Sequence, residues 1–317
     1  MRKLLFLPIA LASFTTISSA QTITQTFGTG VNAFTMDFVT IGNPNNAADT
    51  PGRIPKPTGS VAYIYNLGKY EVSRDQIDKA NAAGSLGITM FDMSGFGGNG
   101  GNRPATGVSW YEAAGYANWL NESKGYQAAY KFVGGTFQLW SSTDAGYDAN
   151  NMFRNSQAKY VIASRNEWYK GAYGNADGSW SNYPNGSDSA PMPVASGTAA
   201  NTAVYNVPGP ADINNAGGLS AYGTMAQGGN VWEWNETALD ESNEIASETR
   251  VLSGGMWSAN GNDLNASVFY YGSPSDEESG YGTGFRIASV PEPSSLSLLA
   301  LGGVAGVAFR RLLKRRS

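Results

Sequence analysis

The chain has 317 residues, of which 15% are charged and 40 are glycine, and it contains neither cysteine nor histidine. These absences exclude disulfides, thiolate nucleophiles, Ser-His-Asp triads, and zinc or iron sites built from Cys or His. A bound metal would need oxygen ligands, which favours calcium or magnesium. The hydrophobic fraction of 41%, with 8 Trp, 17 Tyr and 13 Phe, suffices for a core, so the composition indicates a loop-rich folded protein.

Both ends of the chain are typical of targeting segments. Arg2 and Lys3 precede the apolar run 4–12, and small residues occupy 18–20, so residues 1–20 are predicted to be a secretory signal peptide. At the other end, the uncharged stretch 294–309 is followed by five basic residues. Its apolar length falls slightly short of the roughly 20 residues that span a bilayer, but the basic cluster fits a cytoplasmic stop. We expect residues 290–317 to form a C-terminal tail with a short transmembrane segment.

The region between these ends is acidic. Seven of the 21 basic residues but only one of the 25 acidic residues lie in the terminal segments, which leaves residues 21–290 with a net charge of −10. Phosphate contacts need clustered cations, so we expect no nucleic-acid partner.

The N-terminal half of this region mixes strand and helix patterns. Residues 21–35 are polar and indicate an N-terminal strand or a loose arm, and the alternation at 36–41 predicts a strand. A second extended piece is expected at 61–67 and 70–72. Ser73 begins a predicted helix over 74–83, and Ser109, with Glu112 three residues later, begins one over 110–123.

The C-terminal half is less regular. Residues 130–139 suggest a strand pair, and Ser164 begins a helix that ends at Tyr173. Gly, Asn, Pro and Ser then dominate 174–229, a stretch too long for a structureless loop in a compact domain. Short aromatic segments follow at 230–236 and 250–257, and 284–288 is expected to be the closing strand. No linker divides the region, so we predict one domain over 21–289.

Six segments, in this order, resemble the sulfatase-modifying-factor family, to which the formylglycine-generating enzyme belongs. GNVWEW is the most specific of them. They are Gly68-Lys69-Tyr70-Glu71-Val72-Ser73, Val108-Ser109-Trp110-Tyr111-Glu112-Ala113, Asn166-Glu167-Trp168, Gly229-Asn230-Val231-Trp232-Glu233-Trp234, Ser253-Gly254-Gly255-Met256-Trp257 and Gly284-Phe285-Arg286. The resemblance implies an α+β fold, irregular and loop-rich, related to the C-type lectin fold, which would account for the long stretch without periodicity.

The C-terminal tail resembles the PEP-CTERM sorting signal of Gram-negative bacteria, through Val290-Pro291-Glu292-Pro293, the apolar stretch and the basic end. This implies an exosortase-type sorting enzyme as partner and an association with extracellular polysaccharide or a surface protein. The expected location is the periplasm, outer surface or extracellular matrix, after transient anchoring in the inner membrane through the tail.

The family resemblance also implies calcium. Carried over to this chain, Gly229 and Val231 would supply carbonyls and Glu233 a carboxylate, while Ala226 replaces the usual Asn or Asp and removes one oxygen. The alternative for Glu233 is a carboxylate paired with a buried arginine or with backbone amides. A second family site would begin at Asn201 and Thr202, with Asp212 as its acidic ligand.

The resemblance also locates the redox metal of the family. Formylglycine-generating members bind copper between two cysteines, and the matching positions here are Ala259 and Leu264, which cannot ligate soft Cu(I). A related branch binds iron through histidines, which this chain lacks. We therefore expect neither copper nor iron.

Three functional classes follow. The first is an exported, surface-sorted domain without redox catalysis that serves as a binding or structural module, with exposed aromatics stacking on sugars. The aromatics in question are Trp180, Tyr183, Tyr270, Tyr271 and Tyr281. The second is a carboxylate-based enzyme such as a glycan hydrolase, with acids from the runs 233–244 or 276–278. The third is an oxidoreductase of the formylglycine-generating and nonheme-iron superfamily.

Overall fold

The computed structural model describes residues 22–50, 57–277 and 281–291. The predicted signal peptide and the predicted transmembrane stretch 294–309 lie outside these ranges. Within them, no helix combines the length and the apolar character needed to cross a membrane.

A five-stranded sheet brings together segments from both ends of the domain. Its strands, in spatial order, are β1 (Thr22–Phe27), β2 (Phe34–Ile41), β3 (Tyr65–Gly68), β13 (Ile287–Ser289) and β6 (Tyr160–Ile162). The polar arm at 21–35 therefore contributes a strand, and the strand predicted at 36–41 is confirmed within β2. The extended piece predicted at 61–72 is a strand only over β3. The closing strand β13 lies between β3 and β6, antiparallel to both, so it ties the C-terminal end of the domain into this sheet.

A four-stranded sheet carries the GNVWEW segment. Its order is β11 (Tyr270–Gly272), β10 (Arg250–Ser253), β9 (Trp232–Ala238) and β12 (Thr283–Phe285). Strand β12 pairs with β9 in parallel, with Gly284 opposite Glu233, and Ser253 of β10 faces Glu233 from the other side. Arg286 is the single residue between β12 and β13, so the chain passes from one sheet to the other at this arginine.

Three helices begin where the sequence predicts, because each starts with a serine capping box. They are α1 (Arg74–Gly84), α2 (Trp110–Glu122) and α3 (Arg165–Tyr173). In each box the serine hydroxyl accepts from the backbone of the third helical residue, whose side chain accepts from the serine N–H, which satisfies donors that a helix end leaves open. Three short 3₁₀ turns complete the helical elements, η1 (Gly30–Asn32), η2 (Ser94–Phe96) and η3 (Gly261–Leu264).

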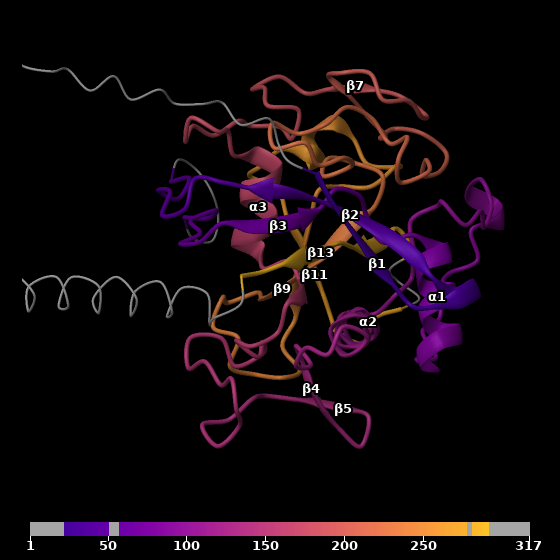
Figure 1. The fold of residues 1–317 in the computed structure, drawn as a ribbon. Helices are drawn as coiled ribbons and strands as arrows, with labels where there is room; N and C mark the ends of the chain where they lie inside the picture. Colours follow the sequence, from indigo (N-terminus) through magenta and orange to yellow (C-terminus); the bar gives the residue numbers. More distant parts are fainter. Residues whose placement is uncertain (1–21, 51–56, 278–280, 292–317) are drawn as a thin grey trace, which may run out of the picture.

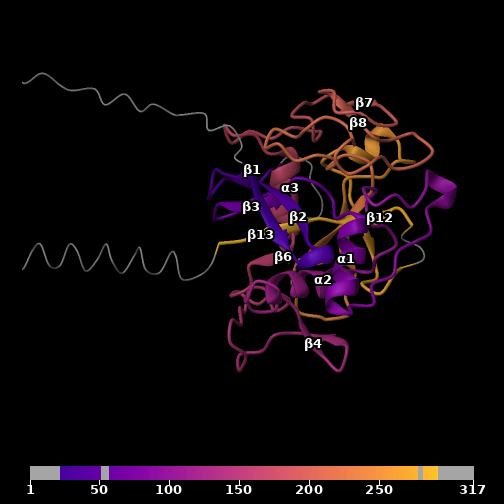
Figure 2. The same ribbon diagram turned by 45° about the vertical axis from the view of Figure 1, so that its right-hand side comes forward.

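The remaining strands lie at opposite ends of the molecule, as both ribbon views show (Figures 1 and 2). The predicted strand pair at 130–139 is the hairpin of β4 (Lys131–Val133) and β5 (Thr136–Gln138). At the other end the irregular stretch 174–229 forms packed loops with only two short paired strands, β7 (Met192–Pro193) and β8 (Thr202–Ala203). Loop hydrogen bonds such as Val194 N to Ala203 O (2.9 Å) hold this region in place of regular structure.

The core between the two ends is aromatic. Trp110 of α2 is fully buried, and its ring lies 5.1 Å from Phe137 and 5.2 Å from Tyr130, both in edge-on geometry. Such pairs contribute about 0.5–1.5 kcal/mol each beyond burial of their area. The side chain of Arg250 lies over the rings of Trp110 and Phe153, which fixes β10 against this cluster.

Candidate functional site

Strand β9 presents different chemistry on its two faces. Successive side chains of a strand point to opposite sides, so Trp232 and Trp234 share one face and Glu233 points the other way. The structure agrees with this expectation, because both tryptophans line one open cleft while Glu233 is fully buried on the opposite side.

Glu233 is paired with the arginine that joins the two sheets. Arg286 donates from Nε to one Glu233 oxygen at 2.6 Å and from Nη2 to the other, and Trp168 Nε1 adds a third donor at 2.7 Å. The same guanidinium donates to the carbonyls of Gly68, at the end of β3, and of Met225. The alternative of a buried arginine pair is therefore the arrangement found, and it ties the two sheets together.

A second carboxyl lies close to this pair. Glu71 is buried and accepts from Asn230 Nδ2 and from the backbone N–H of Val231 at 3.2 Å. Burial and the negative charge of Glu233 raise the pKa of Glu71 well above its usual range, although Arg286 and the hydrogen bonds oppose this. Gly229 is required beside them, since an added Cβ would stand 2.2 Å from the carbonyl oxygen of Val204.

A second buried network surrounds Arg154. Its guanidinium pairs with Glu236 at 2.7 Å and with Glu167 at 2.9 Å, and both carboxylates are almost fully buried. Burial alone raises the pKa of Glu167, but the charge and hydrogen bonds of Arg154 outweigh it and hold that pKa at about 2. Tyr63 and Tyr130 complete the network through hydrogen bonds of 2.7 Å to Glu167 and Glu236. Glu236, a member of the predicted acidic run, is thus committed to holding the fold.

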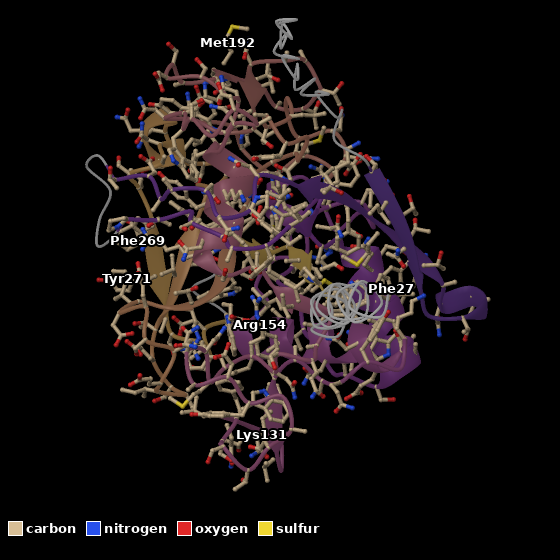
Figure 3. All side chains as sticks on the ribbon, turned by 60° about the vertical axis from the view of Figure 1, so that its left-hand side comes forward. Phe27, Lys131, Arg154, Met192, Phe269 and Tyr271 are labelled. Atoms are coloured by element: carbon tan, nitrogen blue, oxygen red, sulfur yellow. The ribbon has the colours of Figure 1, made fainter. Side chains whose placement is uncertain are left out.

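The open cleft lies on the tryptophan face of the four-stranded sheet and has a volume of about 370 Å³. Tyr270 and Tyr271 of β11 are 60% and 58% exposed, and the ring of Tyr270 lies 5.2 Å from that of Trp232. Tyr271 lies at the outer margin of the molecule in Figure 3, whereas Arg154 lies towards the middle of that view. The other lining residues come from β10, β11, β12, η3 and the loops between them: Leu252, Met256, Ala259, Asp263, Gly272, Asp276, Tyr281, Gly282 and Thr283.

The two positions expected to match the copper ligands of the family have different surroundings. Ala259 lines the cleft itself. Leu264, at the end of η3, is fully buried in a small apolar cluster with Ala203 and Tyr205. Both side chains are hydrocarbon and the chain contains no cysteine or histidine, so the residues present do not fit Cu(I).

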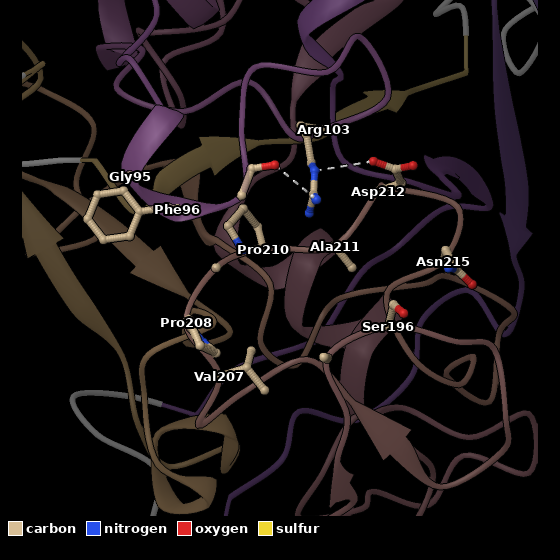
Figure 4. Close-up of a pocket in the computed structure, with 13 residues that line it drawn as sticks. Gly95, Phe96, Arg103, Ser196, Val207, Pro208, Pro210, Ala211, Asp212 and Asn215 are labelled. Carbon is tan, nitrogen blue, oxygen red and sulfur yellow. Dashed lines mark hydrogen bonds and ion pairs between the residues drawn. The ribbon is translucent and has the colours of Figure 1, made fainter.

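The predicted second calcium segment does not converge on one point. Asp212 lines a surface groove and pairs with Arg103, whose Nε lies 3.4 Å from a carboxylate oxygen (Figure 4). Thr202 lines a different cavity and donates its hydroxyl to the carbonyl of Ala199 at 2.7 Å. The carbonyl of Asn201 accepts from Met192 N at 2.8 Å.

Calcium fits the first predicted segment poorly as well. Both oxygens of Glu233 already accept from a cation, so Glu233 and Arg286 together offer calcium no net negative charge. Across the described ranges, no three acidic side chains gather as a metal cluster would require. Calcium at Gly229, Val231 and Glu233 stays a prediction, and these contacts count against it.

The predicted sugar-stacking aromatics divide into two groups. Tyr270, Tyr271 and Tyr281 share the cleft, whereas Trp180 packs on Tyr169 at 5.4 Å and Tyr183 packs on the apolar cluster of Leu264. Sequence reasoning missed Asp263, because a single acid in a turn carries no pattern. It also missed Arg154, whose partners follow 13 and 82 residues later.

Comparison with known families gives a direct assignment. The model of the sulfatase-modifying factor enzyme 1-like domain matches residues 35–290, and the PEP-CTERM protein-sorting motif matches residues 289–315. No curated protein sequence matches the chain. The sorting motif marks an exported, surface-targeted protein of Gram-negative bacteria that an exosortase-type system processes.

Solved structures match the chain at low sequence identity. Treponema denticola variable protein 1 is 19% identical over 85% of this chain and 99% of its own, with a TM-score of 0.52. CarF is 18% identical over 81% of this chain and 98% of its own, with a TM-score of 0.54. PvdO from Pseudomonas aeruginosa is 15% identical over 84% of this chain and 98% of its own, with a TM-score of 0.48. The chain belongs to the sulfatase-modifying factor enzyme 1-like family and has its irregular, loop-rich, C-type-lectin-like α+β fold.

Proposed function

We propose that this protein is a surface-displayed binding module that has kept the family fold and lost the family redox chemistry. The observation that carries the proposal is the open aromatic cleft with Ala259 in its lining, together with the burial of Leu264 in an apolar cluster. Without a thiol or an imidazole in the whole chain, copper and iron lack the ligands that the family uses. Exposed tyrosine rings in a cleft provide contact area at little entropic cost, which suits binding.

Turnover and binding assays on the full-length chain test this proposal. We expect no thiol-to-aldehyde conversion of a cysteine peptide in the presence of copper, and retention of one class of extracellular polysaccharide or surface protein. Tyr271→Ala should reduce that retention, whereas Tyr183→Ala, outside the cleft, should leave it unchanged. Aldehyde formation would overturn the proposal.

A carboxylate-based hydrolase is the competing function. Glu233 and Glu236 are paired with arginines, and the acids that line the open cleft are Asp263 and Asp276. We therefore test the hydrolase at these two aspartates. Release of reducing ends from a bound glycan, abolished by Asp276→Asn, would establish it. Binding without release favours the module.

Calcium binding is tested in a separate experiment. A bound ion raises the free energy of unfolding by about 2.7 kcal/mol when its concentration is a hundredfold above Kd. A chelator would then lower the melting temperature, and Glu233→Gln would remove the effect if the ion lies at the first segment. If the chelator left the melting temperature unchanged, both predicted calcium sites would be wrong.

A further inference from the structure

The aromatic cleft contains negative charge and no positive charge. Asp263 and Asp276 line it, and no lysine or arginine does. Elsewhere in the molecule the buried carboxylates of Glu233, Glu236 and Glu167 each have an arginine within 3 Å. The two aspartates of the cleft form no ion pair with any residue in the described ranges.

Among the described residues, each of these aspartates has hydrogen-bond partners for only one of its carboxylate oxygens. Asp263 Oδ2 accepts from the backbone and the side chain of Asn260, at 3.1 and 2.8 Å. Asp276 Oδ2 accepts from the backbone N–H of Ser273 at 3.2 Å. In each carboxylate, Oδ1 accepts no hydrogen bond from the described residues. Both side chains are held by their turns and keep a free acceptor, which leaves two uncompensated charges beside the aromatic rings.

The aromatic rings of the cleft also favour a positively charged ligand. An aromatic face carries a negative quadrupole and attracts a cation, more strongly where water is excluded. Tyr270 packs on Trp232, and Tyr281 packs on Trp257 at 5.9 Å, so these rings are fixed before any ligand arrives. The hydroxyls of Tyr270, Tyr271 and Tyr281 form no hydrogen bond with the described residues. The cleft thus offers a ligand flat rings, two free carboxylate oxygens and three free hydroxyls.

We infer that the cleft binds amino sugars with a protonated amine, as units of a glucosamine-type polysaccharide. This inference rests on the proposed binding function and names its ligand class. The ammonium group pairs with a free aspartate oxygen, the apolar face of the pyranose ring lies on a tyrosine, and the sugar hydroxyls use the remaining polar groups. A lysine side chain would satisfy one of these polar groups and leave the others without partners, so a sugar fits the set better than a cationic peptide does.

N-acetylation provides the test, because it removes the charge and keeps the ring. Calorimetry on the full-length chain would compare a glucosamine hexamer, its N-acetylated counterpart and a neutral glucose hexamer. We expect the free-amine hexamer to bind about tenfold more tightly than the other two, with an advantage that shrinks as salt rises. Asp276→Asn, which is isosteric, should remove most of that advantage, whereas Asp188→Asn, an exposed aspartate that does not line the cleft, should leave it intact.

The other outcomes separate the two claims. If all three hexamers bind equally and Tyr271→Ala abolishes binding, the module stands and the amino-sugar inference is wrong. If none binds but a lysine-rich peptide does, and Asp276→Asn weakens it, the partner is a protein and the inference is also wrong. If neither a sugar nor a peptide binds, the amino-sugar inference is wrong, and the binding module is then judged by the retention assay on extracellular polysaccharides and surface proteins. Melting temperatures of the variants, compared with that of the unmodified chain, confirm that each is folded.

Discussion

Acidic side chains on the two sides of strand β9 differ in their hydrogen-bond and ion-pair partners. Glu233, on the side of the strand opposite the cleft, has a guanidinium and an indole as donors, and Glu236, buried further along the strand, has Arg154, Tyr130 and Asn151. In the cleft on its other side, Asp263 and Asp276 accept, among the described residues, only hydrogen bonds from their own turns. Burying a carboxylate without a partner costs several kcal/mol, so the interior acids must be paired, while the cleft acids are hydrated and free to meet a ligand. Pairing thus distinguishes acids that hold the fold from acids available for binding.

The largest expected effect comes from breaking the pair that joins the sheets. Arg286→Met leaves the buried Glu233 carboxylate without its counter-charge, so we expect a loss of about 3–5 kcal/mol in the free energy of unfolding, measured by urea denaturation. Arg103→Met removes a half-exposed pair with Asp212 and should cost less than about 1 kcal/mol. Adding Glu233→Leu to Arg286→Met should recover part of the loss, because no buried charge then remains unpaired. Equal losses for Arg286→Met and Arg103→Met would contradict this contrast between buried and exposed pairs.

Unfolding at low pH should reveal how much the Arg154 network contributes to stability. The folded pKa of Glu167, about 2, lies below its ordinary value of 4.5, so its ionised form is bound more tightly in the fold. Its contribution is complete above pH 4.5 and is lost as the pH falls towards 2, with a size of about 3 kcal/mol. Urea midpoints measured from pH 7 to pH 2 should fall less steeply for Glu167→Gln than for the unmodified chain. Parallel profiles would show that Glu167 does not titrate in this way.

Glu71 provides a control, because its ionisation should change the free energy of unfolding in the direction opposite to that of Glu167. Its pKa is raised in the fold, so its ionisation destabilises the folded state as the pH rises above 4.5. Glu71→Gln should therefore flatten the profile above pH 4.5 and leave the slope below pH 4.5 unchanged. If both variants altered the same pH window, the assignment of the two carboxyls would be wrong.

The smallest effects should come from removing single tyrosine hydroxyls. Tyr130→Phe takes a hydrogen bond from the buried Glu236, so we expect a loss of about 1–3 kcal/mol in the free energy of unfolding. Tyr271→Phe at the exposed cleft should change that free energy by less than about 0.5 kcal/mol. Thermal unfolding of the two variants measures the difference. A destabilised Tyr271→Phe would mean that the cleft is part of the structural framework.

Local pattern was sufficient for the start of each of the helices α1, α2 and α3, the C-terminal sorting motif and one feature of the site. The serines of the three capping boxes act on residues three positions away, so sequence neighbours specify where each helix begins. The alternation of Trp232, Glu233 and Trp234 likewise placed the tryptophans on one face of a strand. The absence of Cys and His, and the motifs over 35–290, identified the family and the missing redox ligands.

Tertiary structure decided what each acid does. Glu233 meets Arg286 across 53 residues, and Glu236 meets Arg154 across 82, through contacts that no local periodicity encodes. The cleft joins residues of β9 with tyrosines from β11 and with aspartates from two separate turns. A carboxylate has the same composition and charge wherever it occurs in the sequence. Its role depends on which side chains the folded chain brings within hydrogen-bond distance of it. A carboxylate that meets a buried arginine stabilises the fold, whereas one without such a partner is available for binding. Tertiary packing alone determines which of these it is.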